Sequence, residues 1–282
     1  MALSKITNAS VADTAVHGRR NLIINGGMQV AQRGTSVSGI YGFYTLDRWR
    51  IYSAASVTAS QQSFSLGQTD VSGFPKNYIR LVPSSAIYNL SQRIEDLTTV
   101  GGKTLTLSFW IKGSESATFD ISYTRFFGTG GSSADTTEFA SLVNITTSWT
   151  KVEKTFTLAS LSGKTVGAGS YLQITIGDGI AFASSQTVEV AQVQLEVGDT
   201  ATPFEHRSYG EELALCQRYY IKSGNVGTDT EWFAGVATYA GYGGSFAQCI
   251  DGNQDRVVSH VKFPVYMRAR PTVTYYPARS DT

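Results

Sequence analysis

The sequence has few charges and only two cysteines, and each shortage excludes a class of protein. Only 16% of the 282 residues are charged, and 23 Lys and Arg residues balance 22 Asp and Glu residues to a net charge of +1. A balanced charge provides no long-range positive field for nucleic acid, so we expect no nucleic-acid partner. Cys216 and Cys249 are too few for a disulfide framework and lack zinc-ligand neighbours, so we expect buried free thiols.

Long apolar runs are missing as well. No stretch approaches the ~18 consecutive apolar residues of a membrane helix, so we expect no membrane insertion. The first five residues, MALSK, are not followed by the apolar run of a secretory signal. We therefore expect a soluble protein that is made in a reducing cytoplasm, whatever its later location.

What the sequence has in abundance are small turn-forming residues, including 28 Gly, and apolar residues in period-two runs. Leu105, Leu107, Phe109 and Ile111 alternate with polar residues and with Trp110, which predicts a strand with one face in a core. Similar runs occur at 119–124, 152–158, 172–176 and 188–195, separated by Gly, Ser, Asn and Asp clusters. Many short strands with such turns predict an all-β fold, a jelly-roll β-sandwich spanning residues 21–207.

The remaining segments predict three further parts. Residues 1–20 have no core-forming pattern and are interpreted as an attachment arm that orders against a partner. Ser208 and Glu211 form a capping box before a short helix within 208–222. Its Leu213, Cys216 and Tyr220 share one face and are candidate oligomer contacts. Residues 223–282 predict a small C-terminal β module with strands near 233–242, 246–250, 257–263 and 272–276.

Catalytic and metal patterns are weak. No Gly-x-Ser-x-Gly nucleophile elbow accompanies His17, His206 or His260, so we predict no hydrolytic triad and no enzyme. A glycosidase needs two facing carboxylates, and the sequence does not single out a pair among Glu95, Asp96, Asp120, Glu138, Glu153 and Glu189. The Asp251-x-Asn253-x-Asp255 spacing resembles the start of a calcium loop, but Arg256 stands where glycine is required. No metal or cofactor is therefore predicted.

The aromatic residues provide the candidate ligand site. The C–H faces of sugar rings stack on aromatic rings, while amides, carboxylates and Arg bond the hydroxyls. Trp110 lies opposite a core face on its own strand, so it faces a groove or another subunit. We name Trp110, Tyr123, Arg125 and Trp49 as candidate glycan contacts; for Trp49, the alternative is that it closes the sandwich.

Several longer runs resemble a family of bacteriophage tail-fibre and virion structural proteins that carry a carbohydrate-binding-module-like jelly roll. The similarity covers about residues 20–277. The runs are RNLIINGGMQVAQRG (20–34), YTLDRW (44–49), LTLSFWIKGS (105–114), AQVQLE (191–196), ATPFE (201–205), RSYGEEL (207–213), CQRYY (216–220), FPV (263–265) and MRARPTV (267–273).

The resemblance implies a fibre, spike or decoration subunit of a virion, commonly a homotrimer, made in the host cytoplasm. The arm would join other virion proteins, and the sandwich would recognise host-surface glycan with avidity from trimeric display. Two rival hypotheses remain: a structural decoration or connector of capsid or tail without ligand, and a polysaccharide depolymerase.

Overall fold

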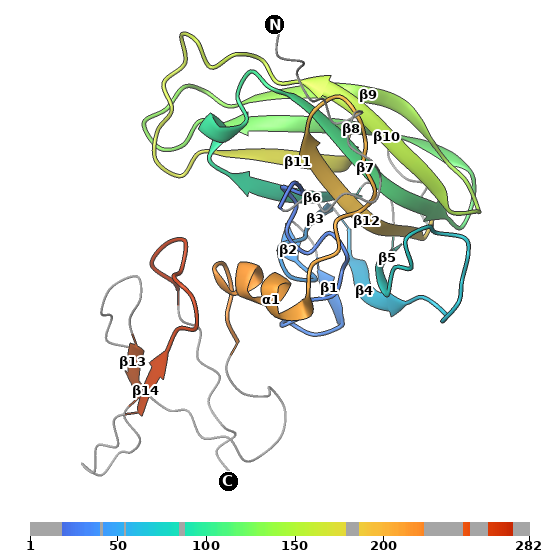
Figure 1. Cartoon of the computed structure of the whole chain (residues 1–282), viewed down its shortest axis with the longest axis horizontal. Coiled ribbons are helices and arrows are strands. Elements are labelled where there is room, and N and C mark those ends of the chain that lie inside the picture. Colours follow the sequence, from blue (N-terminus) through green and yellow to red (C-terminus); the bar gives the residue numbers. More distant parts are fainter. Residues whose placement is uncertain are drawn as a thin grey trace, which may run out of the picture. The chain divides into compact units, whose positions relative to one another are not determined.

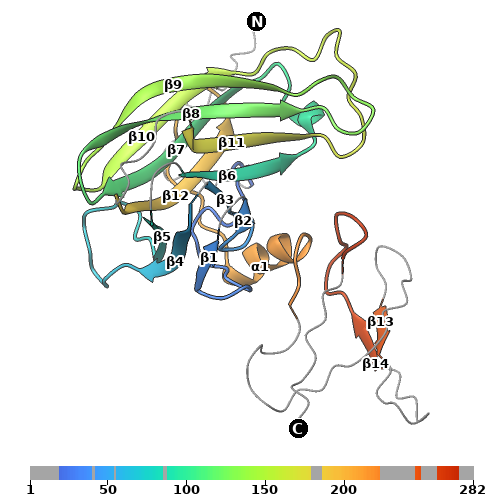
Figure 2. The ribbon, with the colours of Figure 1, turned by 180° about the vertical axis from the view of Figure 1, so that it is seen from behind.

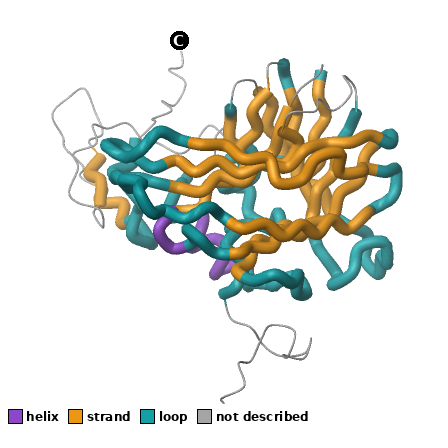
Figure 3. The backbone as a smooth tube through the Cα atoms, turned by 90° about the horizontal axis from the view of Figure 1, so that it is seen from above, coloured by secondary structure: helices purple, strands orange, loops and turns teal. Residues whose placement is uncertain are grey.

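The computed structural model describes residues 19–39, 42–53, 55–84, 88–178, 186–222, 245–248 and 259–272. The chain divides into two compact units, Met1–Tyr209 and Gly210–Thr282. The first unit holds two six-stranded sheets, seen as two layers in Figure 1 and from behind in Figure 2. Its strands are joined by loops at the sheet ends (Figure 3).

Both sheets are antiparallel throughout. Sheet A has the order β1-β4-β5-β12-β7-β10, with β1 Ser36–Gly39, β4 Val57–Ser63, β5 Asn77–Pro83, β12 Val188–Val197, β7 Thr104–Gly113 and β10 Thr150–Thr157. Sheet B has the order β2-β3-β6-β11-β8-β9, with β2 Phe43–Tyr44, β3 Arg50–Ser53, β6 Tyr88–Glu95, β11 Tyr171–Asp178, β8 Ala117–Phe126 and β9 Asp135–Ile145. A 3-10 turn, Leu97–Thr99, follows β6. The predicted all-β sandwich is confirmed.

The core lies between the two sheets and follows the predicted alternation. Leu105, Leu107, Phe109 and Ile111 of β7 are fully buried, and they pack in one cluster with apolar residues of sheet B. Strand β11 contributes Leu172, Ile174 and Ile176 to the same cluster. Period-two patterning places these side chains on one face because successive residues of a strand point to opposite sides.

Strand β12 departs from strict alternation. Its pairing with β7 shifts register between Ala191 and Gln194, and Gln192 takes a positive φ of 48°. A bulge inserts one residue, so Val190 and Val193 both face the core although they are three positions apart. The outward face of sheet A thereby gains Gln192.

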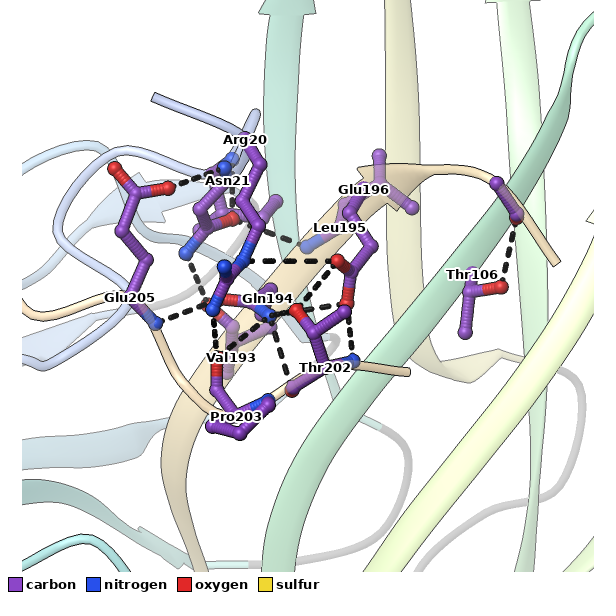
Figure 4. A network of polar contacts seen from close by, with 12 residues as sticks. Arg20, Asn21, Thr106, Val193, Gln194, Leu195, Glu196, Thr202, Pro203 and Glu205 are labelled. Atoms are coloured by element: carbon purple, nitrogen blue, oxygen red, sulfur yellow. Dashed lines mark hydrogen bonds and ion pairs between the residues drawn. The ribbon is translucent and has the colours of Figure 1, made fainter. Parts of the chain in front are cut away.

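The first described segment is bound to the end of β12 and to the segment after it (Figure 4). Asn21 donates from Nδ2 to the Val193 carbonyl at 3.1 Å and accepts from the Leu195 amide at 3.0 Å. The Asn21 amide donates to Glu205 Oε2 at 2.7 Å, and the Glu205 amide donates to Gln194 Oε1 at 2.8 Å. We call this network of 20–25, 193–196 and 202–207 the clasp.

Next to the clasp, two of the motif runs pack together. Asn25 is fully buried, and its Nδ2 donates to the carbonyls of Val30 and Asp47 at 2.9 Å each. Trp49 Nε1 donates to the Asn25 carbonyl at 2.9 Å. Runs 20–34 and 44–49 therefore serve to build the sandwich.

The second unit contains α1, Tyr209–Gln217, and the hairpin of β13, Ser245–Gln248, and β14, Ser259–Lys262. Cys216 is buried and is not part of a disulfide bond, and Leu213 and Tyr220 are half-buried. The Arg268 amide donates to the Arg218 carbonyl at 2.9 Å. The oligomer contacts of Leu213, Cys216 and Tyr220, and the boundaries 1–20, 21–207, 208–222 and 223–282, stay predictions.

Some predicted features fall outside the described residues: residues 1–18 of the predicted arm with His17, the 233–242 segment, Cys249, the 251–255 turn, and residues 273–276 of the last predicted strand. Within the described ranges, no helix has the length and hydropathy of a membrane span.

Candidate functional site

The structure places Trp49 and Tyr123 in the core. Trp49 is 1% exposed, and Tyr123 is 4% exposed with its ring stacked against Phe139 and Phe156. Ring faces covered in this way cannot stack on a sugar in this conformation. Trp49 lies in the core cluster, which agrees with the alternative expectation that this residue closes the sandwich.

Arg125 is also buried, and its hydrogen bonds are structural. Its Nε and Nη2 donate to the two carboxylate oxygens of Asp135 at 2.8 and 2.7 Å, and Nη1 donates to the Ala159 carbonyl at 2.9 Å. The bidentate pair joins β8 to β9, and the third bond holds the segment after β10. The four predicted glycan contacts are thus not brought together, and only Trp110 lies on an outward face with part of its surface exposed.

A different set of residues gathers on the outward face of sheet B. Adjacent strands align Arg50 with Ser91, Ser91 with Thr175, and Thr175 with Ser122. Their strand neighbours Ile51, Leu90, Ile174 and Ile121 are in the core, so this row points away from it. We call the outward residues Arg50, Tyr52, Ser91, Arg93, Ser122, Phe126, Tyr171, Gln173 and Thr175 the sheet B face.

A second row on the sheet B face carries directed hydrogen-bonding groups. Arg93 pairs with Gln173 across β6 and β11, and its Nε donates to Gln173 Oε1 at 3.0 Å. Gln173 Nε2 donates to Thr175 Oγ1 at 3.3 Å. These contacts fix the orientation of the amide and the guanidinium, and the guanidinium has five N–H donors in all.

Aromatic rings flank these rows on both sides. Tyr171 stacks on Phe126 with ring centroids 4.7 Å apart, and the guanidinium carbon of Arg93 lies 4.5 Å from the Tyr171 centroid. On the other side, Tyr52 is 47% exposed, with Arg50 5.9 Å from its ring. The face offers apolar ring surface beside fixed donors and acceptors, the combination that typically orients a polar ligand.

Sequence reasoning missed Tyr52, Arg93, Tyr171 and Gln173. The available signal was the alternation of core-facing and outward-facing residues along each strand. Tyr52 follows the core residue Ile51, and Gln173 lies between the core residues Leu172 and Ile174. The strand order that places β3, β6, β11 and β8 side by side joins residues about 120 positions apart. Local patterning does not contain that order.

Trp110 lies on the outward face of sheet A. It pairs with Lys151 of β10 on one side and with Ala191 of β12 on the other. It lines a pocket of about 60 Å³ together with Ser108, Gln192, Thr202 and Phe204. That Trp110 faces a groove or another subunit stays a prediction. In the structure, Trp110 is one of the residues that line this pocket.

The carboxylates considered for glycosidase chemistry have structural partners where their side chains are described. Glu189 pairs with Arg80 at 2.7 Å, Glu153 with Lys151 at 2.5 Å, and Asp120 accepts the Leu142 amide at 3.0 Å. Thr98, through its side chain and its amide, lowers the pKa of Asp96. Among the described residues, no group of three or more His, Cys, Asp or Glu could hold a metal ion.

Asp47 is a carboxylate whose pKa is raised by burial in the fold. It is 1% exposed and accepts from the Gln32 amide at 2.6 Å and from Gln32 Nε2 at 3.1 Å. Burial raises the pKa of Asp47, and the Gln32 hydrogen bonds and the Arg33 charge only partly oppose that effect. Asp47 lies among the motif runs near Asn25, so its role is structural.

Comparison with known proteins finds a match in the sandwich. Residues 92–168 match the family model described as "Carbohydrate binding domain", which covers about a quarter of the chain, from within β6 to the loop before β11. No curated protein matches the chain. The sandwich thus contains a segment similar to carbohydrate-binding domains.

Solved structures are similar at low identity. The enzymatically active domain of tailspike protein 4 of bacteriophage CBA120 is 15% identical with a TM-score of 0.38; the match covers 63% of this chain and 21% of that chain. The CBM22-1 xylan-binding domain of Xyn10C from Paenibacillus barcinonensis is 13% identical with a TM-score of 0.39, covering 66% and 100%. TmCBM61, solved with β-1,4-galactotriose, is 12% identical with a TM-score of 0.33, covering 64% and 100%.

Proposed function

We propose that this chain is a carbohydrate-binding virion component that attaches a phage to host-surface glycan through the sheet B face, without cleaving the glycan. The observation that carries the proposal is the arrangement of Arg93, Gln173 and Tyr171, which combines fixed polar groups with an aromatic ring on one half-buried outward face. The family match of residues 92–168 supports a carbohydrate as the ligand class.

The chemistry of the face suits a sugar ring. Tyr52 provides ring surface for axial C–H groups, and Arg93 and Gln173 provide a donor and an acceptor for vicinal hydroxyls. Such open faces bind weakly because they desolvate little of the ligand. A homotrimer would multiply this weak binding into useful avidity, with residues 1–20 attaching the subunit to the particle.

The experiment is a glycan-array and affinity-electrophoresis comparison of the full chain with two tyrosine variants. Tyr52→Ala removes a 47% exposed ring from the sheet B face, and Tyr266→Ala removes a 72% exposed ring from the second unit as the matched control. We expect Tyr52→Ala to weaken binding about tenfold, since stacking of one ring is worth roughly 1–1.5 kcal/mol. Tyr266→Ala should bind like the parent chain.

Three results would separate the alternatives. If the parent chain binds no glycan and no host cells, the structural connector replaces the binding role. Release of reducing ends from a host polysaccharide would instead support a depolymerase. Mass spectrometry of purified particles tests the virion assignment, and absence of the chain from particles would contradict it.

A further inference from the structure

The outward face of sheet A carries a small pocket that is separate from the sheet B face. Trp110 of β7 lies between Lys151 and Ala191 in the sheet, and the segment after β12 covers it with Thr202, Pro203 and Phe204. The pocket holds about 60 Å³, which is more than one water molecule needs. Its lining is mixed: Trp110 and Phe204 are aromatic residues, and Ser108 and Thr202 are hydroxyl residues.

Gln192 supplies a hydrogen-bond donor to this pocket. Its side chain lines the pocket and is 4% exposed, and its Nε2 is buried with no hydrogen-bond partner among the described residues. A buried amide donor without an acceptor is costly, so native proteins rarely retain one without a reason. Its backbone also takes φ 48° in the β12 bulge, a conformation that side-chain-bearing residues seldom adopt.

Local packing keeps room around this amide. A Cβ at Gly73 would stand 3.1 Å from Gln192 Nε2, so a larger residue there would crowd the nitrogen. The Phe204 ring is held edge-on against His206, with the ring centroids 5.1 Å apart. The bulge, the glycine and the fixed ring together preserve a donor beside an apolar wall.

The charge of the pocket selects among ligands. Lys151 is its cationic member, and its Nζ is paired with Glu153 at 2.5 Å. The pair has no net charge, and the Glu153 carboxylate would repel an anionic group. A neutral group with one acceptor and a small apolar end fits better than a carboxylate.

We infer that this pocket is a subsite for the acetamido group of an N-acetylated sugar. The acetamido carbonyl accepts from Gln192 Nε2, and its methyl group lies against Trp110 and Phe204. The inference rests on the proposed carbohydrate-binding function and names a substrate class at a second, separate face. It also gives a specific role to Trp110, which the sequence indicates as a candidate glycan contact.

The test uses the full chain with N,N′-diacetylchitobiose and cellobiose, two matched disaccharides that differ in the acetamido group. Saturation-transfer NMR should show strong transfer to the acetyl methyl protons, and calorimetry should show tighter binding of the acetylated sugar. Gln192→Met removes the donor at similar length and should weaken that binding about tenfold, the effect of one lost hydrogen bond. Gln62→Met, which removes another sheet A amide, is the control.

Other results would overturn the inference. Equal binding of the two disaccharides, no transfer to the methyl protons, or unchanged affinity in a folded Gln192→Met variant would each do so. If Tyr52→Ala abolishes binding and Gln192→Met does not, the sugar occupies the sheet B face alone, and the proposed function survives without the subsite. The parent-chain NMR result stands even if Gln192→Met fails to fold.

Discussion

Trp49 and Tyr52 show that aromatic residues close in the sequence can differ completely in exposure. The Trp49 ring is 1% exposed and its Nε1 donates to the Asn25 carbonyl, so it belongs to the core beneath the motif runs. Tyr52, three positions later, is 47% exposed on the sheet B face. Two aromatic residues of one short segment therefore have opposite exposures, which composition alone does not distinguish.

We predict that Trp49→Ala lowers the free energy of unfolding by about 3–5 kcal/mol, the usual cost of truncating a buried large aromatic residue. Denaturant unfolding measures this cost directly. Any variant molecules that remain folded should bind glycan with the affinity of the parent chain. A loss of binding with unchanged stability would instead return Trp49 to the ligand site.

The pH dependence of stability should carry a contribution from Asp47. Burial raises the pKa of Asp47 above its ordinary 3.8 in the folded state, so the folded chain binds more protons than the unfolded chain in that window. Stability from this group is therefore greatest at low pH and falls as pH rises through the raised pKa.

Urea unfolding of the parent chain and Asp47→Asn, from about pH 3 to pH 7, tests this sign. The stability of the parent relative to the variant should decrease as pH rises across the window. A relative stability that increases with pH would mean that the hydrogen bonds from Gln32 and the charge of Arg33 outweigh burial.

At the scale of residues, sequence predicted the core better than the site. Alternation identified Leu105, Leu107, Phe109 and Ile111 because burial on one face leaves a period-two trace. It did not separate Trp49 and Tyr123 from ligand-facing aromatics, since an aromatic residue suits both settings. Arg125 was ambiguous for a similar reason: Asp135, its partner, comes from the neighbouring strand.

Among the elements, the clasp shows why some glycines are needed. A Cβ at Gly26 would stand 2.1 Å from the Val193 carbonyl oxygen, whereas a Cβ at Gly27 would have Phe204 as its nearest neighbour at 3.6 Å. The Val193 amide also donates to the Gly26 carbonyl at 3.0 Å. The first segment can approach β12 this closely because position 26 has no side chain.

We predict that Gly26→Ala destabilises the sandwich by about 1–3 kcal/mol or more, since backbone must move to relieve the clash. Gly27→Ala, the adjacent control, should change stability by no more than about 0.5 kcal/mol. Thermal unfolding of both variants measures the difference. Equal effects would mean that the first segment is not held against β12 as described.

Elements were predicted well where they are long and regular. The helix near 208–222 and the strands β7, β8, β11 and β12 follow clear local patterns, and α1 covers Tyr209–Gln217. The bulge in β12 has no such pattern, because it arises from how β12 fits between β5 and β7. The sheet A pocket depends on that bulge and so could not be predicted from the sequence.

For the whole molecule, the sandwich has two outward faces with different chemistry. The sheet B face is broad and rich in Arg, Tyr and hydroxyl residues, while the sheet A face has a small pocket under the segment after β12. The motif runs that resemble phage virion proteins build the clasp and the core around Asn25. They explain why the fold could be inferred from resemblance, and why the ligand residues could not.

The most direct measurement is a crystal structure of the full chain with an oligosaccharide that it binds on the array. We predict ligand density over the sheet B face, with a sugar ring on Tyr52 and hydroxyl contacts to Arg93 and Gln173. A bound oligosaccharide that leaves the sheet B face bare would contradict the proposed site.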